Sequence, residues 1–357
     1  MGHRGELHPA TSAVAPSDRT HRRPEPKAPM SRRRDRRPLI LLAVLLLLLV
    51  VMVAGIMIGS VSVSIGDIWA ALAGEHTGGG RFIVWNLRLP REQLAALVGK
   101  HLAVAGAILQ SDPRNPLADP QLLGLSGGGA LLAVLALRVA PGAAIGSLPP
   151  LAFAGSLAGA LIVYLLAWRG GVSPSRLILA GVAVGALFAA FTTGILLTSS
   201  LTVQAIMSWL AGGFYARSWP HVETILPYSL IGIAGAMLLA RRLDVLALGD
   251  EPAAVLGVRV QRLRALLTGL AAVLTGSAVA VAGLIGFVGL IVPHAARMLV
   301  GSGHRYAIPV GALLGGALLV GSDLIARTIV EPRELPVGVV TAAIGAPAFL
   351  YLLRRRT

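Results

Sequence analysis

Long apolar runs are the feature that most restricts how this chain can fold. The run 38–59 is long enough to cross a bilayer, which takes about 20 residues. Comparable runs follow at 91–110, 121–138, 147–168, 177–199, 221–240, 265–284, 286–300, 306–327 and 336–353. Only 13% of the residues are charged, whereas soluble domains have about 25%. The pattern predicts an all-α polytopic membrane protein with about ten transmembrane helices, and a short helix at 202–213 on the outer face.

Residues 1–37 have a different character, because they hold nine arginines and Lys27 and show no apolar periodicity. We interpret them as a disordered basic cytoplasmic tail, followed by one transmembrane domain at 38–357. The tail could be mistaken for the charged start of a signal peptide. The apolar run after it is long enough to span, and no convincing cleavage site is present, so we expect a retained first span.

The net charge of +15 comes mostly from the tail and from loops between the apolar runs. Cationic loops remain on the cytoplasmic side of a membrane, so this distribution predicts a multi-pass protein of the cytoplasmic membrane with both termini inside. It does not indicate a nucleic-acid surface. The arginines next to the first span are expected to contact anionic lipid. The arginines expected inside are 114, 169, 176, 241, 242, 259, 262, 264, 297, 305 and 354–356, and those expected outside are 81, 88, 91, 138, 217, 327 and 333.

One charged segment, 241–264, interrupts the apolar runs and carries five arginines and three acids. It cannot lie in hydrocarbon, where each central charge costs roughly 2.5–3.5 kcal/mol. Asp250 is a plausible helix cap and Gly257 a plausible stop, so we expect a short helix over about 252–256 that exposes Ala253, Val255 and Leu256. Such a helix offers a surface for another protein. The alternative is a basic loop that only sets orientation.

Two stretches resemble each other, at 99–108 and 276–285, and share an identical Ala-Val-Ala-Gly core at 103–106 and 280–283. The predicted topology makes the first copy run inward and the second outward, as expected of an inverted repeat. Chance is the alternative explanation, since alanine, valine and glycine dominate the chain.

Several further blocks, taken together in order and spacing, resemble the FecCD family of membrane subunits of ABC importers for iron–siderophore, haem and vitamin B12. The blocks are Arg88–Arg91, Asn115–Pro120, Leu123–Gly128, Gly286–His294 with Arg297, Asp323–Arg327, and Glu334–Thr341 with Gly345–Pro347. The resemblance covers roughly residues 39–353. It implies a ten-span permease that pairs with a second copy or a paralogue, binds two cytoplasmic ATPase subunits and receives substrate from an extracytoplasmic binding protein.

The resemblance also implies roles for particular residues. The charged interruption is similar to the family's ATPase-coupling helix, which would include Gly249, Asp250, Glu251, Pro252, Ala253, Val255, Leu256 and Gly257. Arg88, Arg91 and Arg327 match positions that pair with glutamates of the binding protein. From the residues alone, these arginines could instead extend to lipid headgroups. Asp323 is expected to orient Arg327, four residues away on the same helix.

Lys100 and His101 depart from the family pattern, which has small apolar residues there. Ionisable residues inside a span are candidates for function, so one hypothesis is that the pair lines the translocation pathway and attracts an anionic ferric chelate. The alternatives are contact with a headgroup or pairing with an acid elsewhere.

Other functional classes fit less well. The sequence has no Gly-x-x-x-x-Gly-Lys-Ser/Thr motif, so ATP and Mg²⁺ are expected on the separate ATPase chain, with no cofactor bound here. A stand-alone secondary transporter would need acids at the centre of its spans, and Asp67 and Asp323 fall near span ends. The absence of cysteine and of metal-ligand or catalytic spacings argues against an enzyme or a metal site. We therefore expect a transport subunit for a ferric siderophore, with haem or vitamin B12 as the alternative substrate.

Overall fold

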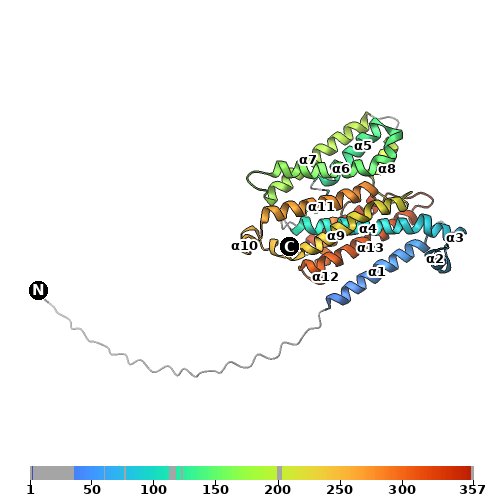
Figure 1. Ribbon diagram of the computed structural model, residues 1–357, viewed down its shortest axis with the longest axis horizontal. Coiled ribbons are helices and arrows are strands. Elements are labelled where there is room, and N and C mark those ends of the chain that lie inside the picture. Colours follow the sequence, from blue (N-terminus) through green and yellow to red (C-terminus); the bar gives the residue numbers. More distant parts are fainter. Residues whose placement is uncertain are drawn as a thin grey trace, which may run out of the picture. The chain divides into compact units, whose positions relative to one another are not determined.

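The computed structural model describes residues 2, 36–59, 61–75, 78–111, 118–121, 124–198 and 203–354. Within these residues the chain is almost wholly helical (Figure 1), apart from an isolated β-bridge between Trp168 and Val172. The elements are α1 (Arg37–Met57), α2 (Ile65–Leu72), α3 (Gly79–Phe82), the π-helical η1 (Ile83–Arg88), α4 (Leu89–Ser111), α5 (Leu125–Val139), α6 (Pro141–Ala167), α7 (Pro174–Leu197), α8 (Val203–Leu210), α9 (Trp219–Leu246), α10 (Asp250–Val255), α11 (Val260–Ala282), α12 (Val288–Val300), α13 (His304–Thr328) and α14 (Val337–Arg354).

Seven helical segments are long and apolar enough to cross a membrane, and three shorter apolar helices, α5, α12 and α14, fall where three further spans were predicted. The prediction of an all-α polytopic protein is confirmed. The short helix expected at 202–213 is α8. The tail expected over 1–37 falls almost entirely outside the described residues, and α1 begins at Arg37.

Two features of the segment 60–90 were not predicted. The short helix α2 begins with a capping box, in which Ser64 Oγ accepts a hydrogen bond from the Asp67 amide and Asp67 accepts one from the Ser64 amide, both at 3.1 Å. The helix that contains α4 starts at Gly79, well before the predicted boundary at 91, and passes through η1. Gly78 occupies the cap position of this helix, and Gly79 and Gly80 are its first two residues.

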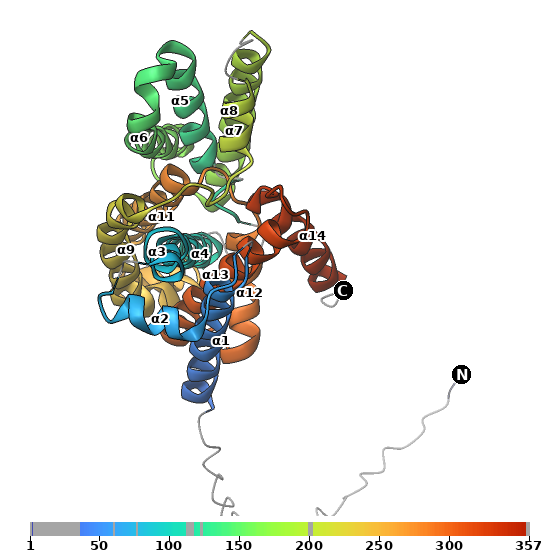
Figure 2. The ribbon, with the colours of Figure 1, turned by 90° about the vertical axis from the view of Figure 1, so that its right-hand side faces the viewer.

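We call the helices α1, α4, α9, α11, α12 and α13 the α4 group. Helix α4 lies at its centre and packs against the other five (Figure 2). Two glycines allow this density. Gly99 lies against the backbone carbonyl of Gly315 in α13, and Gly106 lies against that of Gly289 in α12, so neither position has room for a β-carbon. Small residues let helices approach closely where lipid supplies no hydrophobic drive between them. Packing of this kind was the expectation for Gly289.

Helices α5, α6 and α7 form a second group, which lies to one side of the α4 group and packs on it mainly through α11 (Figure 2). Gly128 of α5 and Gly155 of α6 each lie against the other's carbonyl oxygen, which explains the close contact between these helices. Ser173 caps α7, and Pro174 occupies its first turn, where proline lacks only an amide that would be unpaired anyway.

Polar contacts define two ends of the bundle. We call the end formed by the C-termini of α1 and α13 and the start of α4 the Arg91 end, because Arg91 joins α4 to α13 there. The opposite α10 end contains α10, the last turn of α9 and the first turns of α11 and α13. The arginines predicted to be cytoplasmic lie in the loops and helix ends of the α10 end, where the structure describes them. Arg114, Arg355 and Arg356 lie outside the described residues.

The two copies of the sequence repeat lie in α4 and α11. Helix α4 begins at the Arg91 end and α11 ends there, so the copies run in opposite directions, as the topology predicted. They differ locally, because α4 continues through Gly106 to Ser111, whereas α11 stops at Ala282 and Gly283 has a φ of 72°. That the two halves are related by inverted symmetry stays a prediction.

Candidate functional site

The short helix α10 projects from the loop between α9 and α11. Gly249 before it and Gly257 after it have φ values of 123° and 80°, which glycine adopts without strain. Val255 and Leu256 are 87% and 61% exposed, so an apolar tip faces outward. A short helix with an exposed apolar end is a surface to which another protein can bind.

Two details of the predicted helix were wrong. Asp250 is its first residue and Gly249 occupies the cap position, so the helix covers 250–255 and not 252–256. Ala253 is buried and not exposed, because it faces back toward the bundle while Val255 and Leu256 face away. The first turn carries Asp250 and Glu251, where negative charge complements the helix dipole.

The base of α10 is tied to two other parts of the chain. Arg264 of α11 is fully buried, donates to the Asp250 carboxylate at 3.0 Å and donates to the carbonyl of Val172 at 2.6 Å. Gln261 accepts a hydrogen bond from the Val172 amide at 2.9 Å. A displacement of α10 would therefore act directly on α11 and on the turn between α6 and α7.

A second polar chain joins the end of α9 to α13 and α4. His304, the first residue of α13, contacts Asp244 Oδ1 through Nδ1 at 2.6 Å and Ser111 Oγ through Nε2 at 2.5 Å. Ser111 is the last residue of α4 and also donates to the carbonyl of Ala107. The end of the central helix is thus connected to the segment that leads into α10.

At the Arg91 end, Arg91 is the centre of an ion-pair network. Its Nε and Nη2 donate to the two carboxylate oxygens of Asp323, both at 2.8 Å, and Nη1 and Nη2 donate to Glu334 at 3.1 and 2.9 Å. Arg327 donates to Glu92 at 2.6 Å. Its Nε lies 3.9 Å from Asp323, so Asp323 pairs more closely with Arg91 than with Arg327, the partner expected from the sequence.

Arg88 donates to the carbonyls of Ile56 and Met57 at the end of α1 and to that of Val61 just after it. The three arginines expected to dock a binding protein therefore all have hydrogen-bond partners within this chain, although the buried Nε of Arg327 has none among the described residues. The side chains of Arg91 and Arg327 are 12% and 8% exposed, and Arg88 is also buried. Their docking role stays a prediction, and it now requires an exchange of partners.

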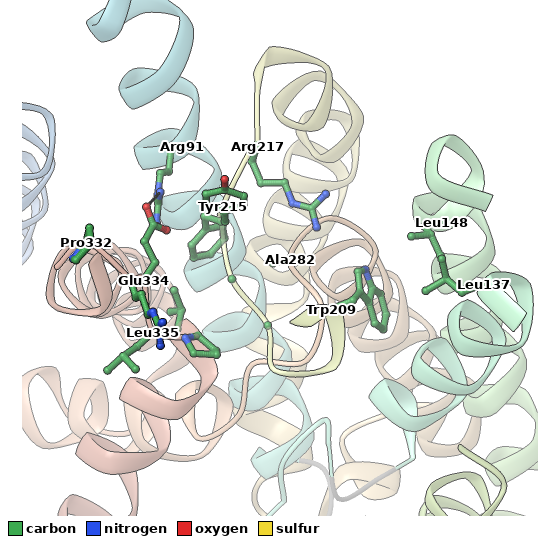
Figure 3. Close-up of a pocket in the computed structure, with 16 residues that line it drawn as sticks. Arg91, Leu137, Leu148, Trp209, Tyr215, Arg217, Ala282, Pro332, Glu334 and Leu335 are labelled. Atoms are coloured by element: carbon green, nitrogen blue, oxygen red, sulfur yellow. Dashed lines mark hydrogen bonds and ion pairs between the residues drawn. The ribbon is translucent and has the colours of Figure 1, made fainter. Parts of the chain in front are cut away.

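A cavity of about 700 Å³ opens at the same end, between the α5–α6 hairpin, the loop from α8 to α9 and the loop from α13 to α14 (Figure 3). Aromatic side chains form part of its wall, namely Trp209, Phe214 and Tyr215. The charged residues that line it are Arg91, Arg217, Arg333 and Glu334. Trp219, at the start of α9, does not line the cavity and packs on Trp85, with the two ring centroids 5.0 Å apart.

Lys100 and His101 lie apart from this cavity. His101 is fully buried at the junction of α4, α9 and α11, with Ser229 Oγ 2.5 Å from Nε2 and Ser277 Oγ 2.9 Å from Nδ1. Lys100 faces a groove of about 440 Å³ formed by α1, α4 and α9, which Glu223 also lines. The pathway hypothesis for the pair stays a prediction, and the structure gives His101 an internal hydrogen-bonding role.

Sequence reasoning did not single out Glu92, Glu334, Asp244 or Arg217 as site residues. Glu92 is fully buried. The signal available in the sequence was its position directly after Arg91, an arginine already singled out, near the start of a predicted span. Glu334 and Arg217 lie in loops whose approach to α4 depends on the tertiary fold.

Comparison with known proteins agrees with this geometry. The model of the FecCD transport family matches residues 46–355. The chain is 48% identical to a cobalamin import system permease protein of Halobacterium salinarum, over 77% of this chain and 74% of the relative. It is 41% identical to the Fe(3+)-citrate import system permease protein YfmD of Bacillus subtilis, over 84% and 90%.

A solved structure of a metal-chelate type ABC transporter in an inward-facing conformation is 32% identical and covers 89% of this chain and 99% of its own, with a TM-score of 0.82. Family model, relatives and fold agree over most of the chain, including the helices that carry both ends of the candidate site. The chain belongs to the FecCD transport family and is a permease subunit of an ABC importer.

Proposed function

We propose that this permease carries a ferric siderophore or similar ferric chelate across the cytoplasmic membrane, with the Arg91 end outside and the α10 end in the cytoplasm. Separate subunits bind ATP and Mg²⁺ and supply the energy, since the sequence lacks the phosphate-binding motif. The excess of arginine in the loops of the α10 end supports this orientation.

The observation that carries the proposal is the construction of α10. It presents Val255 and Leu256 outward, while Asp250 is held by a buried arginine that also holds the turn between α6 and α7. A partner that displaced this apolar tip would act on α11 and on the turn between α6 and α7 together, because the Arg264 guanidinium binds both Asp250 and Val172. We assign this helix as the contact for an ATPase subunit, one for each permease copy of a dimer.

The remaining partners follow from the family and from the opposite end. A second copy or a paralogue completes the permease, and an extracytoplasmic binding protein delivers substrate at the Arg91 end. Arg91 is the most exposed of the three predicted docking arginines, and a partner carboxylate would compete with Glu334 for it.

The absence of cysteine makes the partner assignment directly testable with single introduced cysteines. Val255→Cys is expected to cross-link to a co-expressed ATPase subunit, which then copurifies from the membrane. Tyr215→Cys, 75% exposed at the other end, is the matched control and is expected to give no such product. Equal cross-linking at both positions, or none at Val255→Cys, would refute the assignment of α10.

The same two variants test orientation. A membrane-impermeant maleimide should label Tyr215→Cys in intact spheroplasts and label Val255→Cys only after permeabilisation. The substrate is tested by uptake of ⁵⁵Fe chelates and of labelled cobalamin in cells that express the complete importer. One similar relative is a cobalamin permease. Uptake of cobalamin without uptake of iron would therefore show that the substrate is cobalamin and not a ferric chelate.

A further inference from the structure

The cavity at the Arg91 end contains one half-buried guanidinium, that of Arg217, with no counter-charge among the described residues. Arg91, on the same wall, is neutralised by Asp323 and Glu334. Arg333 is exposed to solvent. Arg217 is half-buried, and its buried Nε has no hydrogen-bond partner within the part of the chain that the structure describes. Burial lowers the pKa of Arg217 from its usual value, which reflects the cost of its charge.

The polar contact of Arg217 with His221 does not satisfy it. His221 Nε2 lies 3.1 Å from Arg217 Nη1, and His221 Nδ1 lies 3.3 Å from the amide nitrogen of Ser218. A neutral imidazole offers one acceptor nitrogen, and a protonated one offers none. Two donors therefore face one acceptor at most, so His221 cannot accept from both Arg217 Nη1 and the Ser218 amide.

The surroundings of Arg217 suit a ligand of mixed character. Figure 3 shows its guanidinium between Tyr215 and Trp209, extending toward the part of the wall formed by Ala282. Apolar side chains of Leu137 and Leu148 lie across the cavity. A guanidinium pairs best with a planar carboxylate, to which it donates two parallel hydrogen bonds.

We propose that Arg217 is a substrate-recognition residue that binds a carboxylate of an anionic ferric chelate as the chelate enters from the Arg91 end. This rests on the proposed function as a ferric-chelate permease and narrows its substrate to chelates that carry free carboxylates, such as ferric citrate. Lys100 was the cation expected to attract such a substrate. It faces a different groove, where the carboxylate of Glu223 is also present.

Paired uptake separates these assignments. Arg217→Gln should lower uptake of ⁵⁵Fe-citrate at low concentration at least about tenfold, as expected for loss of a charge-assisted hydrogen-bond pair. Uptake of a neutral ⁵⁵Fe-trihydroxamate, if carried, should not change. Arg217→Lys should retain part of the citrate uptake, and the controls Lys100→Gln and Arg333→Gln should retain most of it. Equal loss for both chelates, or no loss for either, would overturn the proposal.

A second measurement does not depend on transport. Tyr215→Cys places a thiol at the cavity, where it can be modified by anionic and cationic methanethiosulfonate reagents of similar size. Arg217→Gln in this background should lower the ratio of anionic to cationic rates several-fold, and excess ferric citrate should slow the anionic reaction only when Arg217 is present. An unchanged ratio would overturn the assignment of Arg217. The wild type could transport no ferric chelate and still show the expected ratio of reaction rates and the expected protection by ferric citrate. In that case the proposed substrate of the importer is wrong, and the assignment of Arg217 as an anion-binding residue is retained.

Discussion

Replacing Arg91 by methionine tests whether the Arg91 network holds the bundle together. The change removes four charge-assisted hydrogen bonds and leaves Asp323, whose side chain is 0% exposed, with Arg327 as its nearest cation at 3.9 Å. Breaking a buried pair by removing one partner costs about 3–5 kcal/mol, because the other charge stays buried. We expect a loss of folding free energy of this size.

The chain offers a matched control. Arg81 pairs with Glu75, and the two side chains are 40% and 59% exposed. Exposed pairs contribute about 0.2–1 kcal/mol, so Arg81→Met should have a small effect. The comparison holds the substitution constant, while the two pairs differ in the burial of the carboxylates left behind and in the number of hydrogen bonds lost.

Unfolding by SDS in mixed micelles, followed by tryptophan fluorescence, measures both losses. The double variant Arg91→Met with Asp323→Asn should recover about 2 kcal/mol relative to the sum of the single variants, since it removes the stranded charge. Equal losses for Arg91→Met and Arg81→Met, or strict additivity in the double variant, would show that the network is not a buried ion-pair network.

Three further outcomes are expected. Gly106→Ala should destabilise the protein by about 1–3 kcal/mol, because the new β-carbon would lie 2.6 Å from the Gly289 α-carbon; Gly194→Ala, which meets open space, should be neutral or stabilising in the same assay. Val255→Glu should abolish substrate-stimulated ATPase activity in the assembled importer while insertion and thermal stability stay unchanged, and normal stimulation would contradict the role of α10. Burial raises the pKa of Asp119 from 3.8 to about 6, so the folded state keeps its proton where the unfolded state has lost it. Stability should therefore fall as pH rises from about 4 to 6, and Asp119→Asn should remove this slope in unfolding curves measured across that range.

The sequence was sufficient to locate the ten spans, because their long apolar runs match the thickness of the bilayer. Each of the ten predicted spans overlaps a described helix, and α10 was located from its charge and its flanking glycines. The start of the second span was missed, since the η1 turn carries polar residues such as Asn86 and Arg88, which a hydropathy pattern assigns to a loop.

The site was less accessible to sequence reasoning. Arg91 and Arg327 were singled out by resemblance, but their internal partners could not be known, because Glu92 and Glu334 approach them only through the packing of α4 on α13. Lys100 stood out because a charge within an apolar run is conspicuous. Arg217 lies in the loop between α8 and α9, outside the predicted spans, and only the cavity that it lines distinguishes it.

The network at the Arg91 end also has a consequence for how this protein is made. Arg91 and Glu92 emerge from the ribosome 232 and 235 residues before their partners Asp323 and Arg327. At roughly 5–20 residues per second, α4 waits about 10–50 s with unmatched charges in the middle of a growing membrane protein. Because these charges lie near the end of the span, they must be solvated by water, by lipid headgroups or by other early helices until α13 arrives. The central helix of the finished bundle is therefore synthesised early, and its ion pairs with α13 form late.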